Sequence, residues 1–184
     1  MKLRTLTAVT GLAILGLLAS APSFAATKAE LNASAKKALT HFYTLGSMNK
    51  ELAGKAAGIL IFPSVTKAGA GVAGEYGEGV LQVKGKTVDY YSVTSASVGV
   101  TLGVGTHSEM IMFMTQEALG KFTKSDGWSV GADAAVAVVT QGAGGEYDSA
   151  TLGKPILGFV FSQKGLIGDL SFEGAKVTKI KTKD

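Results

Sequence analysis

The chain has 184 residues, no cysteine, 25 glycines and a formal net charge of +4. Without cysteine it can form neither a disulfide framework nor an acylated lipobox cysteine, so an ordinary hydrophobic core must stabilise it. Arg4 is its single arginine, and the lysines form no run of five or six, which argues against nucleic-acid recognition.

The first 25 residues have the pattern of a secretory signal peptide. Lys2 and Arg4 precede an uncharged apolar run over residues 6–19, and Ser23-Phe24-Ala25 offers a site for cleavage after Ala25. The run is shorter than the roughly 20 residues that span a bilayer. We therefore expect an exported protein, periplasmic or secreted, that can associate peripherally with a membrane. Its mature part is expected to be one domain over residues 26–184 with a net charge of +2.

The segment after the signal predicts two helices. At about 100° per residue, one face of the first helix is an apolar stripe that Lys36 and Lys37 flank. The stripe consists of Leu31, Ala35, Ala38, Leu39, Phe42 and Leu45. A second, short helix is expected from Asn49, as its N-cap, to residue 56.

From Gly58 onward, short apolar or alternating runs separated by turns predict β-strands. Residues 59–62 form a buried strand that Pro63-Ser64 ends, and residues 80–83 and 88–93 are strands joined by a hairpin turn at Lys84-Gly85-Lys86. Residues 98–104, 110–114, 130–139, 156–161, 166–172 and 177–180 are further strands, and Thr115 caps a short helix to residue 122. We predict an α+β fold with a curved, barrel-like antiparallel sheet of about eight short strands, two N-terminal helices and one short internal helix.

Two motifs match enzyme signatures in letters only. Residues 69–74 (GAGVAG) match the dinucleotide fingerprint, but two glutamates follow instead of a helix start, so we interpret them as a glycine-rich loop or strand. Residues 127–131 (GWSVG) match the nucleophile elbow of serine hydrolases. Both histidines precede Ser129, whereas the histidine of an α/β-hydrolase follows its serine, so a serine hydrolase is a less favoured alternative.

The titratable residues predict neither a metal site nor a cofactor. His41 and His107 are far apart, with no cysteine and no His-Glu-x-x-His spacing. We expect His41 on the polar face of the first helix and His107 in a turn, both in solvent. The carboxylate pairs Glu75/Glu78 and Glu146/Asp148 fall in glycine-rich turns, where solvated carboxylates are usual. The sequence thus predicts a protein that is not an enzyme.

Three ordered blocks resemble the SYLF domain, a lipid-binding family of bacteria and eukaryotes. The opening block is AGILIFP at 57–63 with KAG at 67–69 and GEGVL at 77–81. The central block spans 110–122 with VGAD at 130–133, and the closing block is FSQKGLIG at 161–168 with LSFEG at 170–174. The resemblance implies binding of phospholipid, often acidic, through an amphipathic N-terminal helix and basic residues. Some eukaryotic members also bind actin, which an exported chain would not meet.

The helix stripe and the resemblance together define the candidate lipid-binding residues. They are Leu31, Lys36, Lys37, Phe42, Leu45, Lys50, Lys55 and Lys67. The apolar members would enter lipid, and the lysines would lie near lipid phosphates. The alternative for the stripe is that it packs on the sheet, as in most soluble domains.

A small outer-membrane β-barrel is a second class of function that fits the signal, the dispersed glycines and the alternating residues 98–102. Its strands should reach about 9–11 residues. The expected strands are shorter, and aromatic residues do not recur at their ends.

Overall fold

The computed structural model describes residues 26–140, 149–165, 172 and 174–184. The expected signal peptide, the pair Glu146/Asp148 and most of the expected strand 166–172 lie outside these residues. Among the described residues, two long strands dominate: β1 (Gly58–Val83) and β2 (Lys86–Phe113). They pair antiparallel from Gly58 opposite Phe113 to Val83 opposite Lys86. The turn at Lys84 and Gly85, with φ of 50° and 74°, confirms the predicted hairpin.

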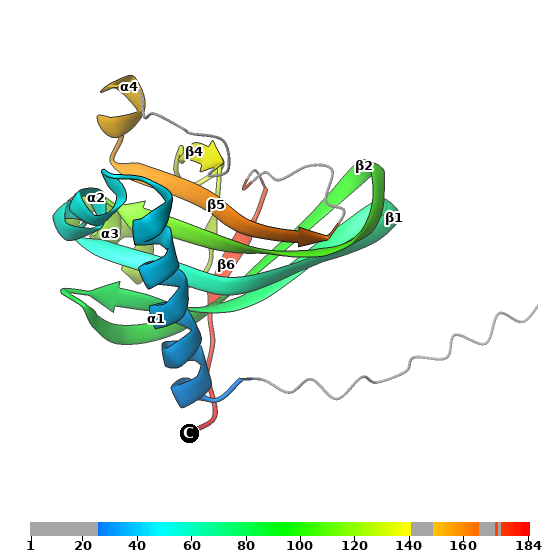
Figure 1. Ribbon diagram of the computed structural model, residues 1–184, viewed down its shortest axis with the longest axis horizontal. Helices are drawn as coiled ribbons and strands as arrows, with labels where there is room; N and C mark the ends of the chain where they lie inside the picture. The colour runs from blue at the N-terminus through cyan, green and yellow to red at the C-terminus, as the bar shows by residue number, and fades with distance from the viewer. Residues whose placement is uncertain (1–25, 141–148, 166–171, 173) are drawn as a thin grey trace, which may run out of the picture.

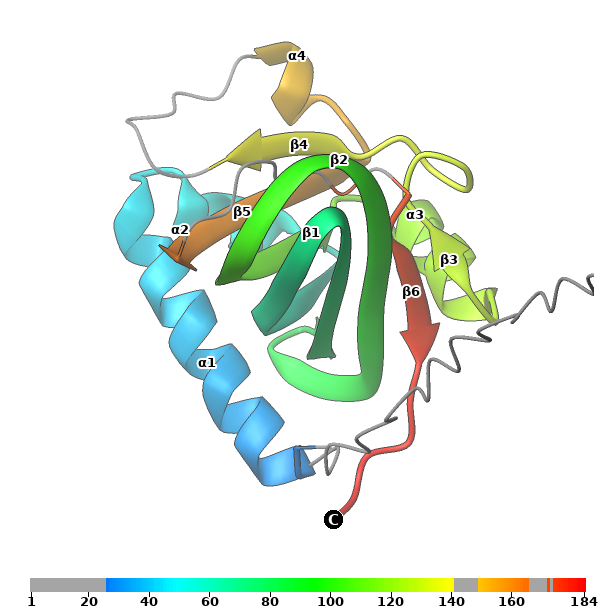
Figure 2. The ribbon, with the colours of Figure 1, turned by 90° about the vertical axis from the view of Figure 1, so that its right-hand side faces the viewer.

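The β1–β2 ribbon bends back on itself midway, so that its two strands appear as nested arches (Figure 2). The register shifts between Ala70 and Val72, and Gly71 has a φ of 77°. A Cβ on Gly69 would lie 2.3 Å from the Val72 oxygen, which no side chain tolerates. The GAGVAG motif is therefore a strand bend, and its interpretation as a glycine-rich loop or strand is confirmed.

The bend brings the two halves of β1 into contact. A Cβ on Gly79 would lie 2.3 Å from the Ile61 oxygen, and one on Gly77 would lie 2.8 Å from the Val65 side chain. Glycine is needed at these positions because the backbone of the other half occupies the space of a side chain.

The other strands complete a strongly curled sheet in the order β3-β6-β2-β5-β4, with β1 on β2. β5 (Ile156–Gly165) and β6 (Lys176–Lys179) pair antiparallel with different parts of β2. β3 (Trp128–Ser129) pairs with β6, and β4 (Ala137–Thr140) runs parallel to β5. The predicted α+β class and curved sheet are confirmed.

Several strands differ in extent from the prediction. The expected runs 59–62 and 80–83 are both parts of β1, and Pro63-Ser64 does not end the first of them. Instead, the register shifts between Phe62 and Val65, a bulge that accommodates a proline without an N–H. The predicted strand 130–139 is wrong except for its last three residues, which belong to β4. A turn intervenes there because the Asp133 carboxylate accepts a hydrogen bond of 2.6 Å from the Ser129 N–H.

At the two ends of β1, residues 58–62 and 79–81, both faces of the sheet are buried, which explains the continuous apolar runs there, whereas buried and exposed residues alternate in the bent middle. α1 (Lys28–Leu45) and α2 (Asn49–Lys55) cover one face, where Ile59 and Ile61 point. On the other face, Leu60 and Phe62 pack with α3 (Gln116–Lys124). Figure 2 shows α1 and α3 on opposite sides of the arches. A short helix, α4 (Ser149–Leu152), precedes β5.

Local capping fixes where the helices begin. Thr27 and Glu30 form a capping box at the start of α1, and the Lys28 N–H donates to the Lys183 oxygen at 3.1 Å, beside the C-terminus (Figure 1). Thr115 caps α3 as predicted. Asn49 is not the N-cap of α2, which is Met48. It is buried, and its Nδ2 donates to the Phe42 oxygen at 2.7 Å, tying the end of α1 to α2.

We predict that Gly69→Ala lowers the free energy of unfolding by about 1–3 kcal/mol, because its Cβ would clash with the backbone of the bend. Gly74→Ala is the matched control in the same motif, where an added Cβ meets nothing within 4 Å. It should change stability by less than about 0.5 kcal/mol. Urea unfolding followed by circular dichroism measures both, and equal stability of the two variants would contradict the clash.

Candidate functional site

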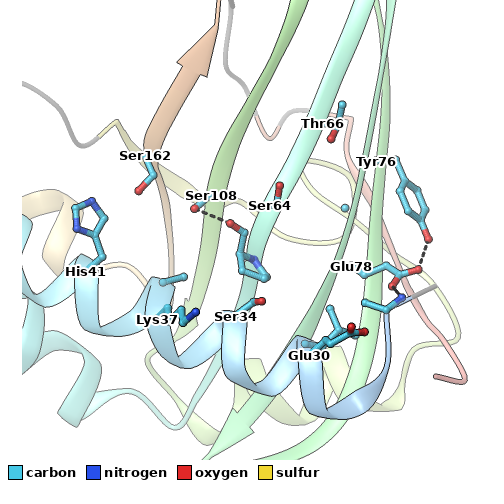
Figure 3. A pocket seen from close by; sticks show the side chains of 15 residues that line it. Glu30, Ser34, Lys37, His41, Ser64, Thr66, Tyr76, Glu78, Ser108 and Ser162 are labelled. Atoms are coloured by element: carbon cyan, nitrogen blue, oxygen red, sulfur yellow. Dashed lines mark hydrogen bonds between the residues drawn. The ribbon is translucent and has the colours of Figure 1, made fainter. Parts of the chain in front are cut away.

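A groove of about 590 Å³ runs between α1 and the bent strand β1 (Figure 3). Its floor and one wall are Leu31, Ala38 and other residues of α1 together with Ala26, which precedes the helix, whereas the opposite wall comes from the two halves of β1. Ser108 of β2 and Ser162 of β5 complete it. The groove exists because the capped helix crosses the sheet where β1 folds back, so its walls come from segments far apart in sequence.

One end of the groove is basic. Lys37 and His41 are one helical turn apart on the exposed side of α1, and Ser162 lies near them (Figure 3). Ser162 has a φ of 57°, a left-handed conformation that is uncommon for a residue with a side chain. It follows Phe161, which is buried, so the backbone turns here from the core to the groove. The end offers an ammonium, an imidazole and a hydroxyl as donors.

The other end of the groove is acidic. The Tyr76 hydroxyl donates to Glu78 Oε1 at 2.7 Å, and the Ala26 N–H donates to Glu78 Oε2 at 3.3 Å. Burial, together with this carboxylate, raises the pKa of Tyr76 to about 12, so the phenol stays a donor. Glu30 accepts bonds from Thr27, which lower the pKa of its carboxyl. Hydroxyls of Ser34, Ser64, Thr66 and Ser108 lie between the two ends.

The apolar residues of the predicted lipid site lie mostly in the core. Leu31 and Phe42 are 4% and 0% exposed. The Phe42 ring packs 4.9 Å from that of Phe159 and 5.4 Å from that of Phe161. Leu45, 38% exposed, remains at the surface. The stripe thus packs on the sheet in this structure, and Leu31 and Phe42 would reach a bilayer only if α1 left the sheet.

The predicted lysines are spread over several places. Lys36 and Lys37 are exposed on α1, and Lys37 lines the groove. Lys50 is exposed beside a second hollow of about 400 Å³. Lys55 forms a surface ion pair with Glu51 at 2.6 Å, and Lys67 is 4% exposed. The groove therefore brings together only Leu31 and Lys37 of the predicted set, and it adds His41 and several hydroxyls that the sequence did not single out.

Lys67 belongs to a buried polar cluster inside the bend. Its Nζ lies 2.8 Å from Glu75 Oε1, and the Ser95 hydroxyl donates to Glu75 Oε2 at 2.8 Å. His107 Nε2 lies 2.8 Å from Glu109 Oε1. Burial raises the pKa of the Glu109 carboxyl, although its hydrogen bond with His107 opposes this.

The cluster corrects two predictions. His107 was expected in a turn and in solvent, but it lies in β2 and is 2% exposed. Glu75 was expected as a solvated carboxylate in a turn, but it is 8% exposed in β1. The bend in β1 places Glu75 opposite Lys67, which lets the pair leave water together. His107 and Glu109, two residues apart, share one face of a strand, and this alternation was a signal in the sequence.

The nucleophile-elbow motif does not form the geometry of a hydrolase. Ser129 ends the two-residue strand β3, and a turn follows it instead of a helix. Its neighbour Trp128 is buried, with its ring 5.4 Å from that of Phe122. His41 lines the groove and His107 is paired with Glu109, so each histidine belongs to a site other than that of Ser129.

We predict that Lys67→Met lowers the free energy of unfolding by about 3–5 kcal/mol, because Glu75 would keep a buried charge without its ammonium partner. Lys36→Met, at an exposed position, should change it by less than about 0.5 kcal/mol. Chemical denaturation of both variants separates a structural lysine from a surface one. A Lys67 variant as stable as the Lys36 variant would disprove the structural role.

The chain is similar to a known protein family. Residues 94–184 match the family model Ysc84, described as "Las17-binding protein actin regulator". No curated protein is significantly similar to the chain. The matched segment contains Ser108 and Ser162 of the groove and His107 and Glu109 of the buried cluster, whereas α1 precedes it. None of the described helices is long and apolar enough to cross a membrane.

Proposed function

Since the chain belongs, through residues 94–184, to the Ysc84 (SYLF) family, we propose that it is an exported, non-catalytic protein that binds phospholipid at a membrane surface. At the level of the family, the role is binding of lipid or of actin-related partners. The observation that carries the lipid proposal is the groove beside α1, which has cationic donors at one end and an apolar floor. An exported chain meets lipid in its own compartment, which favours lipid over actin.

The basic end of the groove binds the phosphate of the head group. Lys37 supplies a positive charge there and Ser162 a neutral donor, and the Ser34 hydroxyl, between the two ends, can also donate to phosphate oxygens. The acidic end, at Glu78, repels a second phosphate and accepts bonds from the hydroxyls or ammonium of a head group. Leu31 and Ala38 stay packed on the sheet, and only the small exposed parts of their side chains, which line the groove, offer apolar surface to the adjoining part of the lipid.

The exposed side of α1 meets the bilayer around the groove. Lys36 and Lys37 lie on this side, and each lysine near an anionic surface contributes about 1 kcal/mol. Leu45 and Met48, 38% and 40% exposed at the C-terminal end of the helix, can enter the interface. Phe42 acts indirectly, by holding the helix on the sheet. The proposal therefore places acidic phospholipid against the polar side of α1 and leaves its apolar stripe in the core.

Liposome flotation tests this arrangement. The mature protein should float with anionic liposomes and much less with neutral ones. Lys37→Glu reverses one charge, removing about 2 kcal/mol of attraction, and should weaken binding about 30-fold. Lys124→Glu, on α3 at the opposite side of the molecule, is the matched control and should float like the wild type. Equal loss in both variants would point to non-specific charge attraction, and a wild type that never floats would refute membrane binding.

Export has its own support in the start of the domain. The expected cleavage after Ala25 removes no part of α1, whose cap is Thr27. Cleavage would also turn the Ala26 nitrogen, 3.3 Å from Glu78 Oε2, into an α-ammonium. A hydrogen bond at the acidic end of the groove would then become an ion pair.

We predict that the full chain, expressed in a bacterium with a periplasm, is recovered there with Ala26 as its first residue, as intact mass and N-terminal sequencing would report. Ala25→Arg places a large charged residue where the processing enzyme needs a small one, and the chain should keep its signal. Ala29→Arg, at an exposed position in the helix, is the control and should be processed normally. Recovery of unprocessed wild-type protein in the cytoplasm would contradict export.

A further inference from the structure

The polar cluster inside the bend of the β1–β2 ribbon contains more potential ligand atoms, nitrogen and oxygen, than its own hydrogen bonds use. One ligand atom from each of Glu75, His107 and Glu109 lies within 4.8 Å of those of the other two. All three side chains are buried. His107 Nδ1 and Glu109 Oε2 are buried without a hydrogen-bond partner. Such groups in native proteins call for an explanation, and an ion is one of the few available.

We propose that Glu75, His107 and Glu109 form a binding site for a divalent transition-metal ion, with Zn²⁺ as the ion that fits best. One imidazole and two carboxylates are a nitrogen and oxygen donor set typical of zinc, and no thiolate is present to favour a softer ion. The site lies inside the sheet, separate from the groove beside α1, and it does not depend on the proposed lipid binding.

The geometry requires only small adjustments of the side chains. Bonds of about 2.0–2.2 Å to Zn²⁺ place neighbouring donor atoms about 3.4 Å apart. His107 Nε2 and Glu109 Oε1, on one face of β2, are 2.8 Å apart, so this pair would have to open slightly to admit the ion. Glu75 comes from the other side of the bend, and rotation of its flexible side chain can shorten the remaining separations. The fourth position would be taken by water or by a second carboxylate oxygen.

Lys67 is compatible with an ion, although it is a cation in the same cluster. It uses one lone pair of Glu75 Oε1, and the Ser95 hydroxyl uses one of Oε2. Each carboxylate oxygen has two lone pairs, so both keep one for a metal. Lys67 and Ser95 then orient the ligand from outside, as partners of metal-bound carboxylates do.

The charge of the cluster also favours a cation. It holds two carboxyl groups, those of Glu75 and Glu109, against the single ammonium of Lys67, with the imidazole of His107 beside them. The carboxyl groups thus outnumber the ammonium, and a bound divalent ion would interact with both of them. The ligands would bind the ion in their deprotonated forms.

Metal titration of the mature protein tests the proposal. Protein stripped with EDTA should bind one Zn²⁺ per chain in equilibrium dialysis against ZnCl₂, with the metal quantified by mass spectrometry. His107→Gln and Glu109→Gln should weaken this binding by about 100-fold or more, since even outer partners of a ligand contribute 10–100-fold. His41→Gln and Glu78→Gln replace the other histidine and a groove carboxylate, and both should bind like the wild type.

Co²⁺ supplies a readout that does not depend on the stability of the variants. Added to stripped wild-type protein, it should give the visible absorption of a cobalt ion bound by nitrogen and oxygen ligands, and Zn²⁺ should abolish this absorption by competition. Stripped wild-type protein that binds neither ion would overturn the proposal. Binding that His41→Gln removes and His107→Gln, checked for intact folding by circular dichroism, leaves intact would overturn it as well.

Discussion

The bend of β1 at residues 69–73 is the constraint on which the rest of the molecule depends. It is possible because Gly69 has no side chain, so its Cα approaches the Val72 oxygen to a distance that a Cβ would forbid. Once the strand turns back, Gly79 packs on Ile61 and the β1–β2 ribbon curls over its own core. The groove and the polar cluster are both consequences, because each contains residues from the two halves of β1.

The buried polar cluster opposes this bend energetically and also gives it specificity. Removing Lys67 and Glu75 from water is costly, and their attraction at 2.8 Å offsets that cost only when both are present. A ribbon that bent one residue earlier or later would place one of these charges in the core alone. The ion pair of Lys67 and Glu75 therefore penalises wrong positions of the bend more strongly than it stabilises the right one. Apolar residues alone would not discriminate between these positions in the same way.

Local patterns predicted the elements that depend on local interactions. Thr115 as the cap of α3, the Lys84-Gly85 turn and the apolar stripe of α1 could all be predicted, because capping, turn chemistry and helical periodicity involve neighbours in sequence. The joining of short runs into the long strands β1 and β2 could not be predicted. A glycine in the sequence is equally compatible with the end of a strand and with a bend in a continuous strand. For the same reason His107 and Glu75 looked like solvated turn residues. Their burial results from contacts across the bend of β1, and the groove is formed by the same bend.

The docking of α1 decides how the protein can engage lipid. Phe42 packs between two phenylalanine rings, and Leu31 is almost fully buried. Burial of a large apolar side chain contributes about 1.5–3 kcal/mol, so undocking the helix would cost several kcal/mol. A bilayer would return much the same transfer energy for these side chains but not the close packing of the aromatic rings. Of the rest of the stripe, Ala35 and Ala38 add little in either place, and Leu45 is already at the surface. The helix therefore gains more by remaining on the sheet, and in the proposed binding mode its exposed side, with Lys36, Lys37 and His41, faces the lipid.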